Sequence, residues 1–105
     1  MRTRKVLLDS DAKSDLRAIH RWIVTQGAPK TASAYIRRIQ KFVGLLKTAS
    51  ERGIPHHDLV AGLRMIPFES VMLAVRVEER TVVVLRIFHS AQDWAHELRE
   101  YAEDN

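Results

Sequence analysis

The chain has 105 residues, of which 46% are hydrophobic and 29% are charged, and its formal net charge is +4. This composition predicts one folded domain over residues 1–105. Because the chain has no cysteine, it has neither disulfides nor thiolate metal sites. No apolar run approaches the roughly 20 residues that span a bilayer. No secretory apolar segment follows the basic N-terminus. We therefore expect a cytoplasmic protein that does not contact membranes.

Arginine makes up most of the 17 basic residues. Arginine contacts phosphate and carboxylate groups with two parallel hydrogen bonds more readily than lysine does. The charge is thus compatible with nucleic acid, with an acidic protein partner, or with an ordinary soluble surface. Charge alone does not choose among these.

The N-terminal half predicts a short strand followed by two helices. Residues 4–8 form an apolar run typical of an edge strand. Residues 12–26 and 29–50 carry apolar side chains at spacings of three and four, which predicts two helices with buried stripes. We place Trp22 and Ile39 on these stripes. The short connection predicts an antiparallel helical hairpin.

Residues 51–61 form a polar segment that we expect to be a mobile loop. It contains His56 and His57, whose side chains diverge because the residues are adjacent. No acidic residue stands at a metal-ligand spacing from them, so we expect no zinc site.

The C-terminal half predicts three strands and a last helix. Apolar residues alternate over 63–67, 71–77 and 83–87, which is typical of strands. We expect Ser90 to cap the last helix, with Asp93 at its third helical position. The predicted fold class is therefore α+β: a short N-terminal strand, an antiparallel helical hairpin packed on a small twisted antiparallel sheet, and a short C-terminal helix.

Three arginines of the predicted sheet are candidates for a binding site. Arg64, Arg76 and Arg86 occupy even positions, opposite in phase to the apolar odd positions. If neighbouring strands pair in an even register, these side chains project from one face. Such a face suits phosphate or carboxylate, but polar residues also occupy the solvent face of ordinary antiparallel sheets. Apolar residues share the even phase, which favours a partner over water; they are Ile66, Val82, Val84 and Phe88.

His89 ends the third predicted strand and has two interpretations. An imidazole suits general acid or base catalysis, but it also serves structurally by bonding the start of the following helix. The chain has no phosphate loop, dinucleotide fingerprint or nucleophile motif. We expect no cofactor and no metal.

Several segments resemble the ParE/RelE superfamily of bacterial toxins from toxin–antitoxin pairs, and most closely the ParE branch, also known as plasmid-stabilisation proteins. They are Asp15-Leu16 with Ile19 and Trp22, the run from Ala32 to Ile36, Gly62 to Pro67, Val84 to His89, and Gln92-Asp93. The last segments, in this order and spacing, are the most specific.

This resemblance implies a RelE/ParE-like fold, a toxin, and a neighbouring ParD-like antitoxin that wraps and neutralises it. It also implies a target. RelE-like members cut mRNA on the ribosome, whereas ParE-like members poison DNA gyrase and meet nucleic acid only indirectly. The residues that we expect to bind a partner are Arg64, Arg76, Arg86, Phe88, His89 and Trp94.

Departures from the family patterns guide the choice of target. His89 is followed by Ser90, so the aromatic residue that often follows in RNA-cutting relatives is missing. Our interpretation is a gyrase inhibitor without catalytic residues. The alternative is a ribosome-dependent endoribonuclease in which Arg64 and Arg86 hold phosphates and His89 moves the proton. In ParE relatives an aromatic pair often replaces Ala74-Val75 and an arginine often replaces Gln92. These departures keep open a third interpretation, a degenerate toxin that only binds its antitoxin or regulates.

Overall fold

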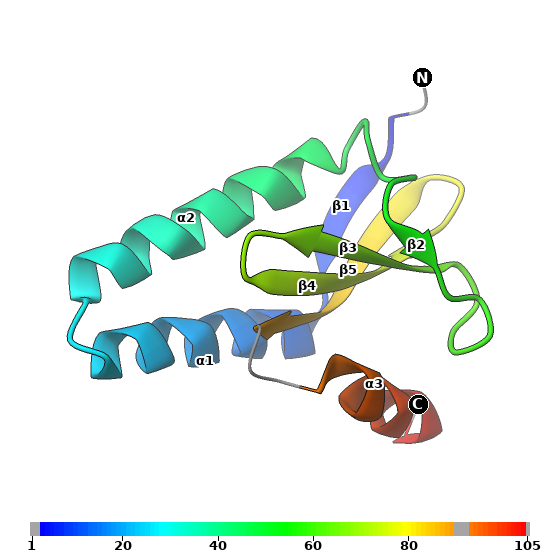
Figure 1. Cartoon of the computed structure of the whole chain (residues 1–105). Helices are drawn as coiled ribbons and strands as arrows, with labels where there is room; N and C mark the ends of the chain where they lie inside the picture. The colour runs from blue at the N-terminus through cyan, green and yellow to red at the C-terminus, as the bar shows by residue number, and fades with distance from the viewer. Residues whose placement is uncertain (1–2, 90–92, 105) are drawn as a thin grey trace.

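The computed structural model describes residues 3–89 and 93–104 (Figure 1). In chain order, the elements are β1 (Lys5–Leu8), α1 (Ser10–Thr25), α2 (Pro29–Leu45), β2 (Ile54–Pro55), β3 (Leu63–Phe68), β4 (Val71–Val77), β5 (Thr81–His89) and α3 (Trp94–Asp104). The predicted α+β class, the helical hairpin and the C-terminal helix are confirmed. Within the described residues, no helix combines the length and apolarity needed to cross a membrane.

The hairpin is defined by local signals at its ends. The Asp9 carboxylate accepts a hydrogen bond from the backbone N–H of Asp11 and caps α1. Gly27 follows α1 with φ +83°, a left-handed conformation that favours glycine. Pro29 opens α2, where its missing N–H costs nothing. The two helices therefore run antiparallel and side by side (Figure 1). α2 ends at Leu45, five residues before the predicted end.

The five strands form one sheet in the order β1-β5-β4-β3-β2. The three predicted strands are confirmed as β3, β4 and β5, and β1 is an edge strand as predicted. However, β1 runs parallel to β5, so the sheet is mixed. This pairing sets Val6 and Leu8 beside Val82 and Val84, which places them against the core under the hairpin.

The expectation of a loop without strands over residues 51–61 is wrong for Ile54 and Pro55. These two residues form β2 and pair antiparallel with Met65 and Arg64. Gly53 permits this approach: it has φ +79°, and an added Cβ would collide with the backbone carbonyl of Met65. The segment is therefore laid closely onto the edge of the sheet.

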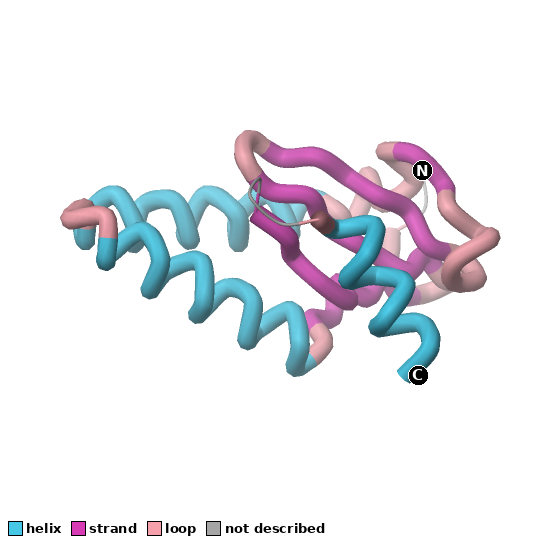
Figure 2. The backbone as a smooth tube through the Cα atoms, turned by 60° about the horizontal axis from the view of Figure 1, so that its bottom comes forward, coloured by secondary structure: helices cyan, strands magenta, loops and turns pink. Residues whose placement is uncertain are grey.

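The two faces of the sheet carry separate cores. The hairpin covers one face, where the buried residues include Leu16, Ile39, Leu46, Ile66, Leu73, Val75, Val84 and Ile87. The single helix α3 lies across the other face (Figure 2). Its smaller core contains Leu63, Met65, Ala74, Leu85, Phe88 and Leu98.

The start of α3 differs from the prediction. Helix α3 begins at Trp94, and the Asp93 carboxylate accepts a hydrogen bond of 3.2 Å from the backbone N–H of His96. Asp93 is therefore the capping residue and not the third helical residue. The predicted cap, Ser90, lies outside the described residues, as does Gln92.

Trp22 is not a core residue. Its exposed fraction is 51%, whereas Ile39 is fully buried as predicted. The buried stripe of α1 runs through Ala12, Leu16 and Ile19, and Trp22 lies beside it on the flank that also carries Asp15, seven residues earlier. There the indole stacks on the imidazole of His89, with ring centroids 5.5 Å apart.

Candidate functional site

The strand register separates the three candidate arginines. In an antiparallel pair, residues directly opposite each other point to the same face. Arg64 is opposite Val75, which belongs to the core under the hairpin, whereas Arg76 is opposite Leu63, which belongs to the core under α3. The expectation of one shared face is therefore wrong for Arg64. The expectation fails because β3 and β4 pair even-numbered residues with odd-numbered ones, so the even-numbered residues of the two strands point to opposite faces.

A bulge brings Arg76 and Arg86 to the same face. Val75 is opposite Val84, but Ala74 is opposite Arg86, so β5 carries one extra residue at this point. Ala74 and Arg76 are two residues apart on β4 and therefore point to the same face. Because Arg86 is opposite Ala74, it also points to that face, which α3 covers. The even-phase apolar residues also divide: Ile66, Val82 and Val84 lie under the hairpin, and Phe88 lies under α3.

Arg86 is the centre of a polar network that joins α1, β5 and α3. Its Nε and Nη2 atoms donate to the two carboxylate oxygens of Asp15 at 2.8 and 3.0 Å. The same Asp15 accepts from the backbone N–H of Ile87 at 2.8 Å. On the other side, Glu97 of α3 lies 3.7 Å from Nη2. The guanidinium also lies 4.8 Å from the centre of the Phe88 ring.

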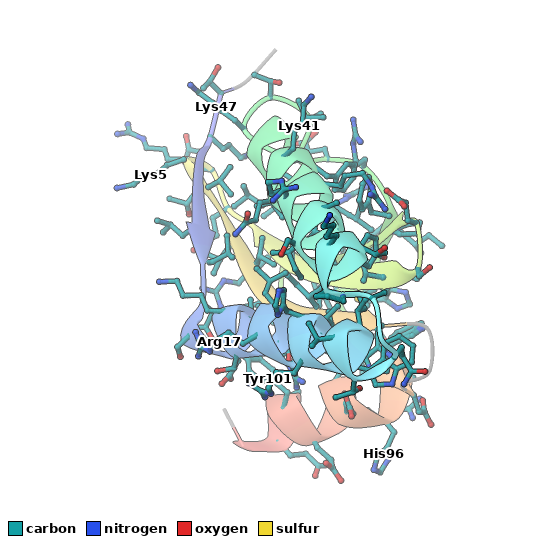
Figure 3. All side chains as sticks on the ribbon, turned by 90° about the vertical axis from the view of Figure 1, so that its left-hand side faces the viewer. Lys5, Arg17, Lys41, Lys47, His96 and Tyr101 are labelled. Carbon is teal, nitrogen blue, oxygen red and sulfur yellow. The ribbon has the colours of Figure 1, made fainter. Side chains whose placement is uncertain are left out.

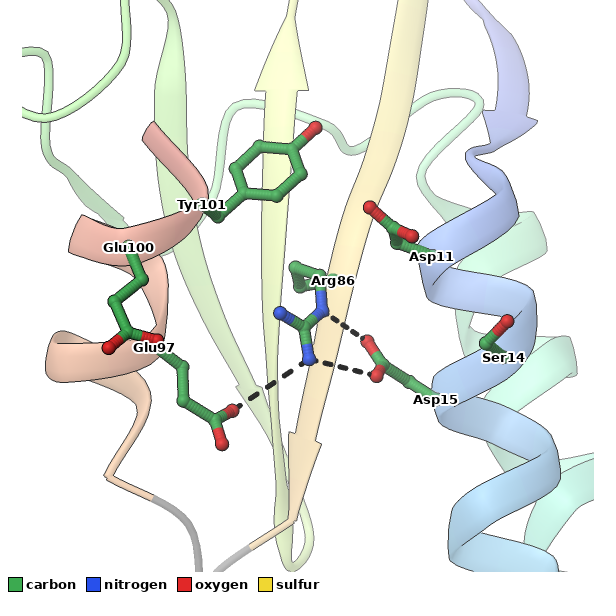
Figure 4. Close-up of a pocket in the computed structure, with 7 residues that line it drawn as sticks. All are labelled: Asp11, Ser14, Asp15, Arg86, Glu97, Glu100 and Tyr101. Atoms are coloured by element: carbon green, nitrogen blue, oxygen red, sulfur yellow. Dashed lines mark hydrogen bonds and ion pairs between the residues drawn. The ribbon is translucent and has the colours of Figure 1, made fainter. Parts of the chain in front are cut away.

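Figure 4 shows the cleft around this network, between α1 and α3. It encloses about 450 Å³, and its lining residues are Asp11, Ser14, Asp15, Arg86, Glu97, Glu100 and Tyr101. Four carboxylates face one guanidinium whose Nε and Nη2 atoms are already bonded. The cleft is thus negative rather than positive, and it is poorly suited to a phosphate.

Two pKa shifts follow from this environment. The hydrogen-bonded Asp15 carboxylate raises the pKa of Arg86 above its ordinary value, although burial acts in the opposite direction. Burial raises the pKa of the Tyr101 phenol, and the charges of Asp9 and Asp11 add to this. Both groups keep their protons near neutral pH, so neither serves as a general base there.

Arg64 has a different environment at the other edge of the sheet. It donates to the backbone carbonyls of Arg52 and Gly53 at 2.9 and 3.4 Å, and so holds the segment that leads into β2. It also lines a hollow of about 320 Å³ with Arg4, Glu51, His57 and the two glutamates that follow β4. Arg76 is about 39% exposed and pairs loosely with Glu78 at 3.6 Å.

Three other predicted residues share a hollow at the end of β5. Phe88, His89 and Trp94 line about 250 Å³ together with residues of the β3–β4 turn. Phe88 is fully buried, whereas His89 and Trp94 are partly exposed. The rings of Trp94 and His56 form a T-shaped contact with centroids 5.8 Å apart, and this contact joins α3 to the segment after β2.

The three residues of the nuclease alternative do not converge. Arg64 and Arg86 lie on opposite faces and on strands separated by β4. His89 points to the hairpin face, since it is opposite Val71 and stacks on Trp22. None of the described hollows contains two of the three. Among the described residues there is also no cluster of three side chains able to hold a metal ion.

Sequence reasoning missed two structural partners. Asp15 was noted only for its resemblance, although an acidic residue beside a buried helical stripe is a signal for a buried partner. Arg4 is only 6% exposed and donates to the Glu78 carbonyl, Ser50 Oγ and Glu51. No local pattern marks Arg4, because its acceptors lie at least 46 residues away.

Solved structures share this fold. A chain of the chromosomal ParDE toxin–antitoxin system from P. aeruginosa superposes with a TM-score of 0.72 and 24% identity, covering 83% of this chain and 96% of the other. A chain of the RelBE2 toxin–antitoxin complex from Mycobacterium tuberculosis gives 0.61 and 23%, covering 88% and 97%. These likenesses define a fold found in toxin–antitoxin complexes. A search of curated protein sequences gives no match.

The family itself follows from the sequence profile. Residues 6–94 match the model of the ParE toxin of the type II toxin–antitoxin system parDE. The chain therefore belongs to the ParE toxin family, and the resemblance described from its residues is confirmed.

Proposed function

We propose that this chain is a toxin that inhibits DNA gyrase, blocks replication, and is neutralised by a ParD-like antitoxin. The observation that carries the proposal is the match to the ParE toxin model over residues 6–94. In this proposal the chain acts by binding its target and contributes no catalytic residue.

The geometry of the arginines supports binding over catalysis. RNA cleavage needs phosphate ligands and a proton-transferring group around one reacting atom. Here Arg86 donates both of its hydrogen bonds to Asp15, at 2.8 and 3.0 Å. Arg64 lies on β3, two strands from Arg86 on β5, and donates to a backbone carbonyl. His89 points to the opposite face from Arg86.

Induced expression tests the target. We expect replication to stop and the DNA-damage response to rise before translation falls, and we expect the purified chain to inhibit supercoiling by gyrase in vitro. Codon-dependent mRNA cleavage on ribosomes that disappears in His89→Ala would overturn the gyrase proposal.

The antitoxin is proposed to use the exposed parts of the predicted partner-binding residues. Arg64, Arg76, His89 and Trp94 offer partly exposed side chains, whereas Arg86 is only 20% exposed and Phe88 is fully buried. Phe88 therefore contributes by supporting its neighbours while α3 stays in place. A stable complex typically buries on the order of 1,000 Å² or more.

Co-expression with the product of the adjacent gene tests this partner. A ParD-like product should co-purify with the chain at moderate salt, and Trp94→Ala should weaken the complex. Failure of the two chains to co-purify under mild salt would count against the antitoxin assignment.

The endoribonuclease remains the second candidate because the RelBE2 chain shares the fold. The degenerate toxin is the third. Ala74 and Val75, which occupy positions where relatives often carry aromatic residues, are both fully buried in the sheet. An absence of any growth defect on strong induction, with the folded chain present, would favour this third candidate.

A further inference from the structure

The helices on the two faces of the sheet differ in charge. The α2 helix, Pro29–Leu45, carries four basic residues and no acidic residue. The α3 helix carries Glu97, Glu100 and Glu103 against Arg99 alone among its described side chains. In Figure 3 the labelled Lys41 and Arg17 lie on the hairpin, and the labelled His96 and Tyr101 lie on α3. Of the two helical layers, the hairpin is thus the positive one.

One flank of α1 is purely cationic. Lys13, Arg17 and Arg21 are all exposed and follow one another at a spacing of four, which aligns them in a row with steps of about 6 Å. The acidic residues of the helix lie on the other flank, where Asp11 and Asp15 line the cleft toward α3.

The cationic flank of α1 borders a groove, and two exposed basic residues of α2 lie next in sequence to residues that line it. This groove of about 410 Å³ runs between the helices, and its lining includes Lys13, Arg17 and His20 from α1 and Ile36 and Gln40 from α2. Arg37 and Lys41 each follow a groove residue of α2 by one position and are exposed. We call Lys13, Arg17, Arg21, Arg37 and Lys41 the cationic face.

The cationic face is not neutralised by the chain itself. Among the described residues none of the five forms an ion pair, and Arg17 makes one hydrogen bond, to Ser14 Oγ at 3.1 Å. Like charges four residues apart on a helix repel each other slightly. The row therefore brings no stability to the fold, and an external polyanion would relieve the repulsion.

We propose that the cationic face binds the phosphate backbone of duplex DNA. Three of its five residues, Arg21, Arg37 and Lys41, lie outside the groove lining. A peptide seated in the groove would not engage them, but a duplex, whose major groove alone is about 12 Å wide, spans both helices. No phenylalanine, tyrosine or tryptophan side chain lines this groove, and His20 is its single aromatic ring, so it lacks the series of stacking rings that single strands use.

This proposal replaces the expectation that the chain meets nucleic acid only indirectly. The choice of DNA over duplex RNA rests on the proposed function, since gyrase works on duplex DNA. Arg64, Arg86 and the other predicted site residues have no part in the cationic face. The negative cleft between α1 and α3 would be repelled by DNA and so would orient the hairpin toward it.

The test uses the purified full-length chain and a short random-sequence DNA duplex, without gyrase or antitoxin. Binding is followed by fluorescence anisotropy at several salt concentrations. The slope of log K against log salt is about −0.9 for each phosphate contacted. The double variants R17Q/R21Q and R37Q/K41Q should each make this slope shallower by about 1.8. The matched control R80Q/R99Q changes the net charge equally at exposed positions outside the hairpin and should keep the slope close to that of the parent chain.

Circular dichroism establishes that each variant is folded before binding is compared. Equal losses in all three double variants would overturn the proposal, because binding would then depend on net charge alone. Equal or tighter binding to duplex RNA of the same length, or to a polyglutamate peptide, would overturn the assignment to DNA. These outcomes are independent of the supercoiling assay, so the gyrase proposal stands or fails separately.

Discussion

The two faces of the sheet are covered in different ways. Two helices of 16 and 17 residues cover one face, and they bury side chains from α1, α2, β3, β4 and β5 in one core. One helix of 11 residues covers the other face, over a smaller core that adjoins a charged cleft. Burial of apolar area is the main stabilising term in a small domain. The hairpin face should therefore determine global stability, whereas the α3 face should be the one that opens locally.

The Arg86 network joins the two faces. Asp15 reaches the sheet from the hairpin, Glu97 approaches from α3, and Arg86 stands between them on β5. Loss of function in an Arg86→Ala variant would therefore need a stability measurement before it is ascribed to a target or an antitoxin, since the change leaves the Asp15 carboxylate without its main partner.

A matched pair of leucine truncations tests the comparison of the faces most strongly. Leu46 and Leu98 are both fully buried, the first under the hairpin and the second on α3. Leu46→Ala should cost about 2–5 kcal/mol of global stability in urea unfolding. Leu98→Ala should cost clearly less, because α3 detaches locally, and it should speed hydrogen exchange in residues 94–104. Equal global losses would show that the two faces unfold as one unit.

Removal of the carboxylate that joins the faces should have the next largest effect. Asp15→Ala leaves the Arg86 guanidinium and the Ile87 N–H without their acceptor. The side chains of Arg86 and Asp15 are each a fifth or less exposed, so we expect the free energy of unfolding to fall by about 1.5–3 kcal/mol. The control is Asp11→Ala, which removes an exposed acid of the same cleft. This variant should change the free energy of unfolding by no more than about 0.5 kcal/mol. If Asp15→Ala left the free energy of unfolding unchanged, the network would contribute nothing to stability.

Trp22 tests how much of the hairpin flank is structural. With half of its side chain exposed, Trp22→Ala should cost roughly 1 kcal/mol, well below the value for a fully buried aromatic residue. Thermal unfolding measures this loss, and Ile39→Ala, which truncates a fully buried side chain, provides the comparison. A loss from Trp22→Ala as large as that from Ile39→Ala would place the indole in the core.

The smallest effect concerns the ion pair between α2 and the β3–β4 turn. The hydrogen bonds from Arg38 lower the pKa of the Glu69 carboxyl from its ordinary 4.5. Because the folded-state pKa lies below the unfolded one, the pair stabilises the fold above the unfolded-state pKa. This contribution is lost as the pH falls through the folded-state pKa. Both side chains are exposed, so the effect on stability is small.

An NMR titration of Glu69 measures this shift directly. In Arg38→Gln the pKa of Glu69 should return toward 4.5, whereas Arg37→Gln, at the neighbouring exposed position, should leave it lowered. An identical Glu69 titration in Arg38→Gln and the parent chain would contradict the assigned cause.

Periodicity and end signals were sufficient for the two long helices and the three central strands, but not for β2 or for the start of α3. The spacing of apolar residues predicted both long helices, and alternation predicted the three central strands, because these patterns are set by the geometry of single elements. Gly27 and Pro29 marked the hairpin connection for the same local reason. The family was also readable from short segments of the chain, and residues 6–94 match the ParE toxin model.

The grouping of the site residues was decided only by the tertiary structure. Alternation along a strand predicts which of its residues point to the same face. Which residues of neighbouring strands share a face depends on the register between the strands and on the extra residue at the β5 bulge. That is why Arg64 separates from Arg76 and Arg86, and why Arg86 finds Asp15, 71 residues earlier in the chain. Likewise, helical spacing placed Trp22 near the stripe, but packing of α1 on the sheet decided that it lies at the surface. Contacts between distant segments depend on the free energy of the whole packed arrangement, which no local pattern encodes.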